Sequence, residues 1–293
     1  MEKKHLQLAN GETLAYLQQG SGEIPLVLIH GNLSSSLYFL PLLKRLPQNV
    51  SAYAFDLRGF GDSTYHQPIT SLKSLAEDLI LAFKALKIKK AHILGWSLGG
   101  GVAMELAAMV PEFVDKLILL ASTTHKGYPI FKKNAGLQPL VGEIYASASE
   151  MASDPLQVKP VIDAINHHNS GFLTYIYDLT IYSNRKPSPE ENDLYISETM
   201  KQRNLSDVDY ALATFNMSDA PNFYRQGDHS IEKIMAKTLH IWGSLDKTVF
   251  ESMVMDNVQA IKHSTFLKWD DCGHSPLVDK PDELAKAVLD FIK

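Results

Sequence analysis

The sequence lacks three features that often reveal a protein's class: several cysteines, long apolar runs and an excess of basic residues. The single cysteine, Cys272, excludes an intramolecular disulfide and is typical of a reducing compartment. No apolar run approaches the roughly 20 residues of a membrane-spanning helix, and the first residues lack the apolar segment of a secretion signal. We therefore expect a cytoplasmic protein without a transmembrane segment.

The charge balance and the missing motifs exclude further classes. The formal net charge is −5 and no basic stripe is present, which argues against nucleic acid as the principal partner. Neither a P-loop nor a dinucleotide fingerprint occurs, so we expect no cofactor. His167 and His168 lie in a polar stretch without a cysteine or carboxylate at metal-ligand spacing, and we expect them to be solvated. The same is expected of His5, His66, His92, His125, His229, His240 and His263.

Strand and helix patterns alternate along most of the 293 residues, of which 45% are apolar. Asn10-Gly11 predicts the turn of a hairpin over residues 5–19. Short apolar runs predict buried strands at 26–29, 52–55, 91–94, 116–121, 238–242 and 265–269. Amphipathic helices are predicted between them and in a last helix that starts near Pro281. This alternation predicts an α/β protein with a mostly parallel, doubly wound sheet.

The alternation is interrupted between residues 123 and 232, where several helical stretches and no strands are predicted. Eight of the twelve tyrosines fall in this segment. Tyrosine suits the roof of a pocket, but a position in a helical core or at the surface is favoured for each one. We predict that residues 123–232 form a helical cap inserted into a core of residues 1–122 and 233–293.

Three helix starts carry capping signals. Ser188-Pro189-Glu190-Glu191 has a capping serine, a proline in the first turn and a glutamate that closes the box. Ser74 and Glu77 have the spacing of a capping box in the helix predicted over 72–86. Ser206 and Asp209 repeat the signal more weakly.

A serine flanked by glycines ends the predicted strand at 91–94. The sequence Gly95-Trp96-Ser97-Leu98-Gly99 has the pattern G-x-S-x-G, and a helical pattern follows at once. Gly95 and Gly99 carry no Cβ where the chain must pass close on both sides of the serine. The pattern predicts that Ser97 is a nucleophile held at the carboxyl edge of the sheet and at a helix N-terminus, where an oxyanion is stabilised.

A serine hydroxyl is a poor nucleophile unless a base takes its proton and a third group orients that base. His274 lies in a glycine-flanked loop after a late strand and is the candidate base. Asp246 also follows a strand and completes the order Ser, Asp, His. Asp270 and Asp271 compete by proximity, but a carboxylate so near His274 in the same loop is harder to aim at Nδ1.

The predicted oxyanion hole consists of two backbone N–H groups. One belongs to Leu98, and the other comes from the loop after His30-Gly31, either from Asn32 or from Leu33. Other conspicuous residues are expected to be structural: His30 beneath this loop, Asp56 and Arg58 in a turn, and Cys272 as a small packing residue.

With these residues the chain resembles the α/β-hydrolase superfamily. The matching motifs are His30-Gly31-Asn32, Asp56-Leu57-Arg58-Gly59-Phe60-Gly61, Gly95–Gly100, Gly243-Ser244-Leu245-Asp246 and Gly273-His274-Ser275-Pro276. The first motif is also similar to that of haloalkane dehalogenases, which carry an aspartate nucleophile followed by a tryptophan. This chain has Ser97 and Leu98 there, so dehalogenation and epoxide opening are disfavoured.

Within the superfamily, Trp96 before Ser97 and three glycines at 99–101 resemble bacterial intracellular short-chain polyhydroxyalkanoate depolymerases. That resemblance implies cleavage of polyhydroxybutyrate or its oligomers through an acyl-enzyme, at a storage-granule surface and without a cofactor. General short-chain carboxylesterases, which act on small-molecule esters, C–C bond hydrolases and perhydrolases share most of these residues and are alternatives. A non-catalytic binding protein on a hydrolase scaffold is the alternative from another class.

Overall fold

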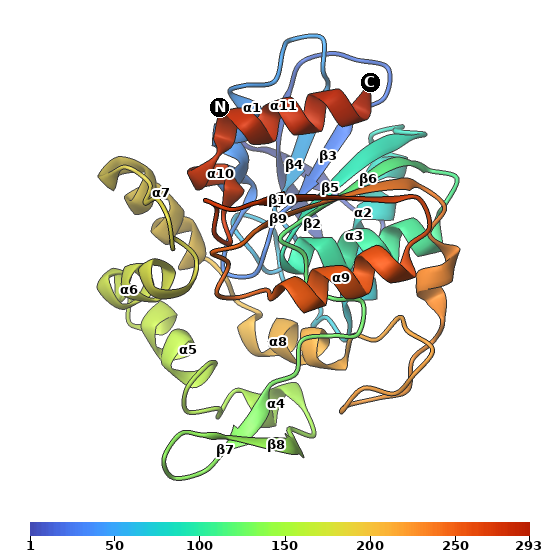
Figure 1. Ribbon diagram of the computed structural model, residues 1–293. Coiled ribbons are helices and arrows are strands. Elements are labelled where there is room, and N and C mark those ends of the chain that lie inside the picture. The colour runs from blue at the N-terminus through green and yellow to red at the C-terminus, as the bar shows by residue number, and fades with distance from the viewer.

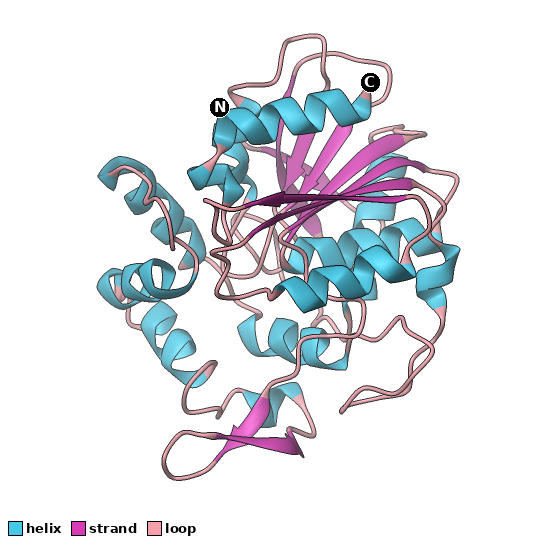
Figure 2. Ribbon diagram, viewed as in Figure 1, coloured by secondary structure: helices cyan, strands magenta, loops and turns pink.

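The computed structural model describes residues 1–293 and contains one eight-stranded sheet at the centre of the molecule (Figures 1 and 2). Its strands run in the order β1-β2-β4-β3-β5-β6-β9-β10. Only β1 and β2 are antiparallel to their neighbours, which confirms a mostly parallel sheet. The strands are β1 Lys4–Gln7, β2 Thr13–Gln19, β3 Leu26–Ile29, β4 Ala52–Phe55, β5 Ala91–Trp96, β6 Val114–Leu120, β9 Lys237–Gly243 and β10 Ser264–Trp269.

Helices cover both faces of this sheet (Figure 1). The helices of the core are α1 Leu40–Leu43, α2 Leu72–Ala85, α3 Leu98–Met109, α9 Glu251–Ala260, α10 Pro276–Asp279 and α11 Pro281–Ile292, with a 3₁₀ helix at Ser36–Phe39. Helices α2, α3 and α9 lie on one face, and α1 and α11 on the other. Side chains alternate along β3: Val27 belongs to the apolar cluster under α2 and α3, and Leu28 to the cluster under α1 and α11. Every residue of β3 is buried because both faces are covered. None of the helices has the length and apolar character needed to span a bilayer.

The segment between β6 and β9 is largely helical. Its helices are α4 Ala148–Met151, α5 Lys159–Asn166, α6 Ser170–Thr180, α7 Pro189–Thr199 and α8 Leu205–Thr214, with a 3₁₀ helix at Ser230–Lys233. Helices α5, α6 and α7 lie to one side of the sheet, whereas α8 packs against α2 of the core (Figure 1). The proposed limits of the cap, 123–232, stay a prediction.

An antiparallel hairpin in this segment was not predicted. Strands β7 Phe131–Lys133 and β8 Pro139–Ile144 form a separate two-stranded sheet, visible below α4 in Figure 1. Its turn is organised by Asn134, whose Oδ1 accepts the N–H groups of Gly136 and Gln138. The strands are short and mostly exposed, so they leave no apolar periodicity in the sequence.

Buried tyrosines join the inserted segment to the core. The ring of Tyr195 in α7 stacks on Tyr38 with a centroid distance of 4.5 Å, and the Tyr38 hydroxyl donates to the Tyr195 carbonyl at 3.0 Å. Tyr177 and Tyr182 are buried in the same apolar cluster. For these residues the helical core is the correct interpretation, and the inserted segment shares a continuous core with the sheet.

One capping signal is confirmed and two are wrong. Ser188 Oγ accepts the N–H of Glu191, whose carboxylate accepts the N–H of Ser188. Helix α2 begins at Leu72 rather than after Ser74, and α8 begins at Leu205 rather than after Ser206. Both first residues are buried, so packing places the helix starts earlier than the polar signals indicate.

Three histidines predicted to be solvated are buried instead. His92 lies on β5, His125 follows β6 and contacts Asn257, and His240 lies on β9. His240 Nε2 lies 3.0 Å from Ser264 Oγ, whereas its Nδ1 has no hydrogen-bond partner. Strand positions in a sheet covered on both faces are buried whatever their side chain, and this explains His92 and His240.

Burial lowers the pKa of His240 from 6.5 to about 4. The unfolded chain therefore binds this proton more readily, and stability is lost as the pH falls from 6.5 towards 4. Over that interval we expect the unfolding free energy of the wild type to fall by about 2–3 kcal/mol more than that of His240→Gln. Urea denaturation at several pH values measures this difference. His5→Gln, at an exposed position, serves as the control and should follow the wild type; equal pH slopes for His240→Gln and wild type would contradict the assignment.

Candidate active site

Ser97 occupies a strained turn between β5 and α3. Its backbone has φ 56° and ψ −119°, in a region that residues other than glycine rarely adopt. A Cβ added to Gly95 would lie 2.2 Å from the carbonyl oxygen of Gly99, and one added to Gly99 would lie 2.1 Å from that of Ile29. Both close contacts are with backbone atoms, so only glycine fits at these positions. The spacing of G-x-S-x-G is thus a steric requirement of this turn.

The turn lies where the strand order of the sheet reverses. The chain passes from β3 to β4 on one side and then to β5 on the other side of β3. The loops after β3 and β5 therefore open a crevice at the carboxyl edge of the sheet, the usual ligand position in such folds. A Cβ added to Gly31 would lie 3.2 Å from Ser97 Cβ, so the loop after β3 runs directly beside the serine.

The structure brings Asp246 and His274 together. His274 Nδ1 lies 2.8 Å from Asp246 Oδ2, and both side chains are almost fully buried. Asp246 Oδ1 accepts the N–H groups of Thr248 and Val249 at 2.8 and 2.9 Å, which fixes the carboxylate. Because a carboxylate only accepts, the shared proton is assigned to Nδ1, and Nε2 keeps its lone pair. A base of the kind that a serine needs is therefore present.

The two competing carboxylates do not approach the imidazole. Asp270 and Asp271 are exposed, and Asp271 forms an ion pair with Lys280 at 2.8 Å. Asp246 reaches His274 because β9 and β10 are parallel neighbours whose carboxyl ends meet at one edge. Within this structure the hydrogen bond of the His274 ring goes to Asp246, and none joins it to Ser97. Hydrogen bonds between a base and the hydroxyl that it activates are often long without substrate and tighten when substrate binds.

Trp96 has a role that the sequence did not reveal. Its indole N–H donates to the backbone carbonyl of His274 at 2.8 Å, and the two rings lie 5.9 Å apart. The ring of Tyr38 also lies 5.9 Å from that of Trp96. The residue before the serine thus holds the loop that carries the histidine.

Backbone N–H groups available for an oxyanion flank Ser97. Leu98 is the first residue of α3, so its N–H has no acceptor within the helix. The N–H of Asn32 also has no acceptor. The N–H of Leu33, in contrast, is bound by Asn32 Oδ1 at 3.0 Å and by Gln202 Oε1 at 2.9 Å. Of the two loop residues considered, Asn32 is the one whose donor is free.

The inserted segment holds this loop through the Asn32 side chain. Asn32 Nδ2 donates to Asp209 Oδ1 at 2.9 Å, and Asn32 Oδ1 accepts from Gln202 Nε2 at 2.9 Å. Asp209 lies on α8, and its predicted role in helix capping is wrong. Neither contact could be predicted from the sequence, because Gln202 and Asp209 are far from Asn32 in the chain and lie in none of the motifs.

A small cavity of about 160 Å³ opens beside Ser97. The core contributes Leu98 and Val249 to its lining, and the segment between β6 and β9 contributes Thr123, Leu205 and Asp209. This volume is below the roughly 300–1,000 Å³ of pockets that enclose drug-sized ligands. The cavity is suited to a small group.

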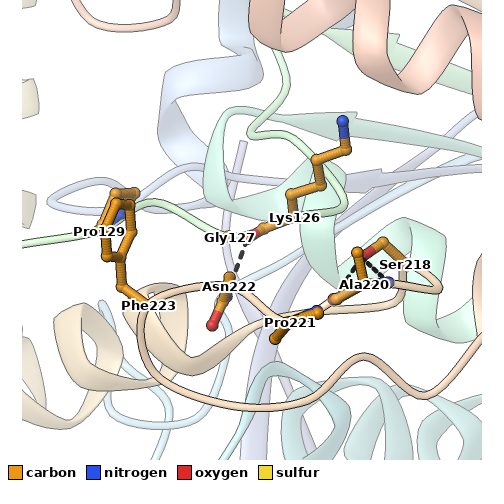
Figure 3. Close-up of a pocket in the computed structure, with 8 residues that line it drawn as sticks. All are labelled: Lys126, Gly127, Pro129, Ser218, Ala220, Pro221, Asn222 and Phe223. Carbon is orange, nitrogen blue, oxygen red and sulfur yellow. Dashed lines mark hydrogen bonds between the residues drawn. The ribbon is translucent and has the colours of Figure 1, made fainter. Parts of the chain in front are cut away.

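A larger hollow of about 570 Å³ lies elsewhere, between residues 126–129 and 218–223 (Figure 3). Asn222 Nδ2 donates to the Lys126 carbonyl at 2.9 Å and joins its two sides, while Phe223 lies beside Pro129. None of the candidate catalytic residues lines this hollow, so we do not assign it to the site.

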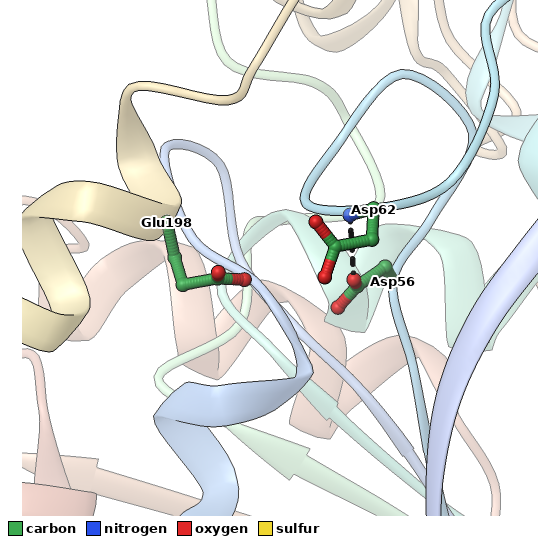
Figure 4. A group of neighbouring side chains, drawn as sticks. All are labelled: Asp56, Asp62 and Glu198. Atoms are coloured by element: carbon green, nitrogen blue, oxygen red, sulfur yellow. Dashed lines mark hydrogen bonds between the residues drawn. The ribbon is translucent and has the colours of Figure 1, made fainter. Parts of the chain in front are cut away.

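Three carboxylates gather near the turn after β4, namely Asp56, Asp62 and Glu198 (Figure 4). The ammonium group of Lys3 binds all three, at 2.7, 2.9 and 2.5 Å. Burial alone would lower the pKa of Lys3, but the attraction of Asp56 and these hydrogen bonds raise it. A protein cation thus occupies the position that a metal ion would need.

The residues expected to be structural make structural contacts. His30 Nε2 accepts the N–H of Leu57 at 3.0 Å, and burial lowers the pKa of His30 to about 4, which keeps it neutral. Asp56 accepts the N–H groups of Ser36 and Asp62, and Arg58 binds Asp78. Cys272 is buried, and burial raises the pKa of its thiol, so it is a poor nucleophile.

Comparisons with known proteins agree on the fold family of this chain. A family model described as the alpha/beta hydrolase fold matches residues 24–281. The human serine hydrolase BPHL is 35% identical over 121 residues, which cover 40% of this chain and 42% of that protein. The pimeloyl-[acyl-carrier protein] methyl ester esterase of Vibrio parahaemolyticus is 26% identical over 277 residues, covering 93% of this chain and 96% of the relative. Among solved structures, an esterase from Exiguobacterium antarcticum has a TM-score of 0.75 at 19% identity and covers 99% of both chains.

The Asp246–His274 pair predicts how the reactivity of Ser97 changes on mutation. Asp246→Asn should slow labelling of Ser97 by a fluorophosphonate by roughly 10³- to 10⁴-fold, because the amide can donate to Nδ1 and favours the wrong imidazole tautomer. Labelling rates at neutral pH measure the effect. Asp270→Asn, in the exposed turn, should label like the wild type. Normal labelling of Asp246→Asn would exclude Asp246 as the orienting acid.

Proposed function

This chain belongs to the alpha/beta hydrolase fold family, and from that membership and the geometry of the site we propose that it hydrolyses carboxylic esters through an acyl-enzyme on Ser97. The observation that supports the proposal most strongly is the buried hydrogen bond between His274 and Asp246, at the sheet edge that also carries Ser97. A base oriented by a carboxylate has no evident structural use in this loop. It is what an attacking hydroxyl requires.

In the proposed mechanism Ser97 Oγ attacks the ester carbonyl carbon while His274 Nε2 takes the hydroxyl proton. Asp246 keeps Nδ1 protonated and stabilises the imidazolium that forms. The carbonyl oxygen becomes negatively charged and accepts hydrogen bonds from the N–H groups of Leu98 and Asn32. The N-terminus of α3 adds a favourable dipole at the same place.

Collapse of this intermediate breaks the bond between the carbonyl carbon and the leaving oxygen. His274 gives its proton to the leaving alcohol, which departs and leaves the acyl group on Ser97. Water then attacks the acyl-enzyme with His274 again as the base, and the acid is released as Ser97 regains its proton. The cycle needs no group beyond the side chains and backbone donors named above.

We propose short, small-molecule esters as the substrate class. The cavity of about 160 Å³ beside Ser97 accommodates a small group, and one relative named above is a methyl ester esterase. Polyhydroxybutyrate or its oligomers are a finer hypothesis, based on Trp96 before Ser97 and the three glycines at 99–101. In this structure Trp96 binds the backbone of His274, a positioning role that does not depend on a polymer substrate.

The test compares wild type with Ser97→Ala on p-nitrophenyl butyrate and on amorphous polyhydroxybutyrate granules. We expect the alanine variant to lose roughly 10³- to 10⁶-fold in kcat on every substrate that the wild type cleaves. Ser153→Ala, an exposed serine in the inserted segment, is the matched control and should retain full activity. Acid release and nitrophenol release are measured in parallel.

The outcomes separate the alternatives. Serine-dependent release from both substrates would support a depolymerase, and release from the small ester alone would support a short-chain esterase. A C–C bond hydrolase would be labelled by a fluorophosphonate, cleave a vinylogous diketone and spare both esters. A binding protein would be neither labelled nor active. Activity that persists in Ser97→Ala would refute the nucleophile assignment.

A further inference from the structure

Asp209 is a buried carboxyl that the mechanism above does not use. It is 7% exposed and lines the cavity beside Ser97. Its Oδ1 accepts from Asn32 Nδ2, and no cation and no second donor binds the carboxyl. Burial raises the pKa of Asp209 to about 7, and the bond from Asn32 offsets only part of that effect. Oδ2 has no partner in the protein and is not among the fully covered atoms, so it is open to the cavity and a donor from a ligand can bind it there.

A second polar group without a partner lines the same cavity. Thr123 is 2% exposed, and its Oγ1 makes no hydrogen bond. It follows β6 of the core, whereas Asp209 lies on α8 of the inserted segment, so the two side chains reach the cavity from independent elements. Much of the remaining lining is apolar, including Leu98, Leu205 and Leu212. A few polar groups in an apolar cavity are the usual composition of a pocket that selects its ligand.

We propose that Asp209, together with Thr123, determines specificity by binding a hydroxyl group of the substrate, so that the preferred esters are short and carry a hydroxyl on the part that enters this cavity. The inference rests on the proposed esterase function and extends it. A hydroxyl donates one hydrogen bond and accepts others, so it can donate to Asp209 Oδ2. It can accept from Thr123 once rotation of that side chain brings the covered Oγ1 to the cavity. An alkyl group of the same size would leave both protein groups unpaired.

The hydrogen bond between Asn32 and Asp209 connects substrate specificity to the reacting carbonyl. The side chain of Asn32 holds Asp209, while its backbone N–H is the proposed oxyanion donor. A hydroxyl bound at Asp209 therefore places the substrate relative to a residue that also contacts the carbonyl oxygen. Correct placement of this kind raises kcat for the hydroxylated ester as well as its binding, and both contribute to kcat/KM.

The experiment measures kcat/KM in a pH-stat for two matched pairs of esters. Methyl butyrate and methyl 3-hydroxybutyrate differ by a hydroxyl on the acyl side, whereas propyl butyrate and 2-hydroxyethyl butyrate differ at the alcohol side. We expect the wild type to prefer the hydroxylated member of one pair. Asp209→Asn should lower that preference roughly 10- to 100-fold, and Thr123→Val by roughly 3- to 10-fold.

Asp207→Asn is the matched control on the same helix. Its carboxylate binds the Tyr65 hydroxyl at 2.6 Å and does not line the cavity, so the preference should stay that of the wild type. Methyl 3-aminobutyrate tests whether the donor is an ammonium group instead. A stronger preference for this amine than for the hydroxyl would overturn the assignment of a hydroxyl.

The failures of the two proposals are distinguishable. If the wild type cleaves all the esters and Asp209→Asn leaves the preference unchanged, the specificity inference is refuted and the esterase proposal stands. If the wild type cleaves none of them and is not labelled at Ser97, the proposed function itself fails. Thermal unfolding checks that each variant is folded, and Thr123→Val carries the test should Asp209→Asn not fold.

Discussion

The contact between the start of α3 and the end of β3 is the constraint on which the rest of the site depends. No Cβ fits on Gly99, because the Ile29 carbonyl oxygen would lie 2.1 Å away. With the two backbones this close, the chain must turn within one residue, and that residue is Ser97 at φ 56°. The turn places the serine hydroxyl, the open N–H of Leu98 and the loop after β3 in one small volume. Strain at Ser97 is thus the cost of bringing the proposed nucleophile and a proposed oxyanion donor together.

The inserted segment is part of the site rather than only its cover. Gln202 and Asp209 bind the side chain of Asn32 from two positions in that segment. Gln202 also accepts the N–H of Leu33, which leaves the N–H of Asn32 as the open donor of the loop. The stacking of Tyr195 on Tyr38 attaches the segment to the core at a third place. A movement of the segment would therefore change the oxyanion loop as well as access to it.

Much of the core could be predicted from sequence because its signals are local. The strands predicted at 26–29 and 52–55 have the same bounds as β3 and β4, because continuous apolar runs indicate strands that are buried on both faces. Asp246 could be favoured over Asp270 because it follows another strand, whereas Asp270 lies in the same loop as His274 and is harder to aim at Nδ1. The hairpin at 131–144 and the buried His240 could not be predicted, because a short exposed strand has no periodicity and a sheet buries polar and apolar side chains alike.

Trp96 and Asp209 show how the structure changes the argument about substrate. The sequence resemblance to polyester depolymerases depends on Trp96 and the glycines at 99–101, yet the Trp96 indole binds the backbone of the loop that carries His274. A tryptophan that positions the base is compatible with many acyl groups and therefore selects none of them. In the sequence Asp209 carries only a weak capping signal, but it is buried in the cavity that we propose a substrate group enters. Since fold and base are common to many chemistries, the evidence about substrate lies on α8 rather than in the motif around the serine.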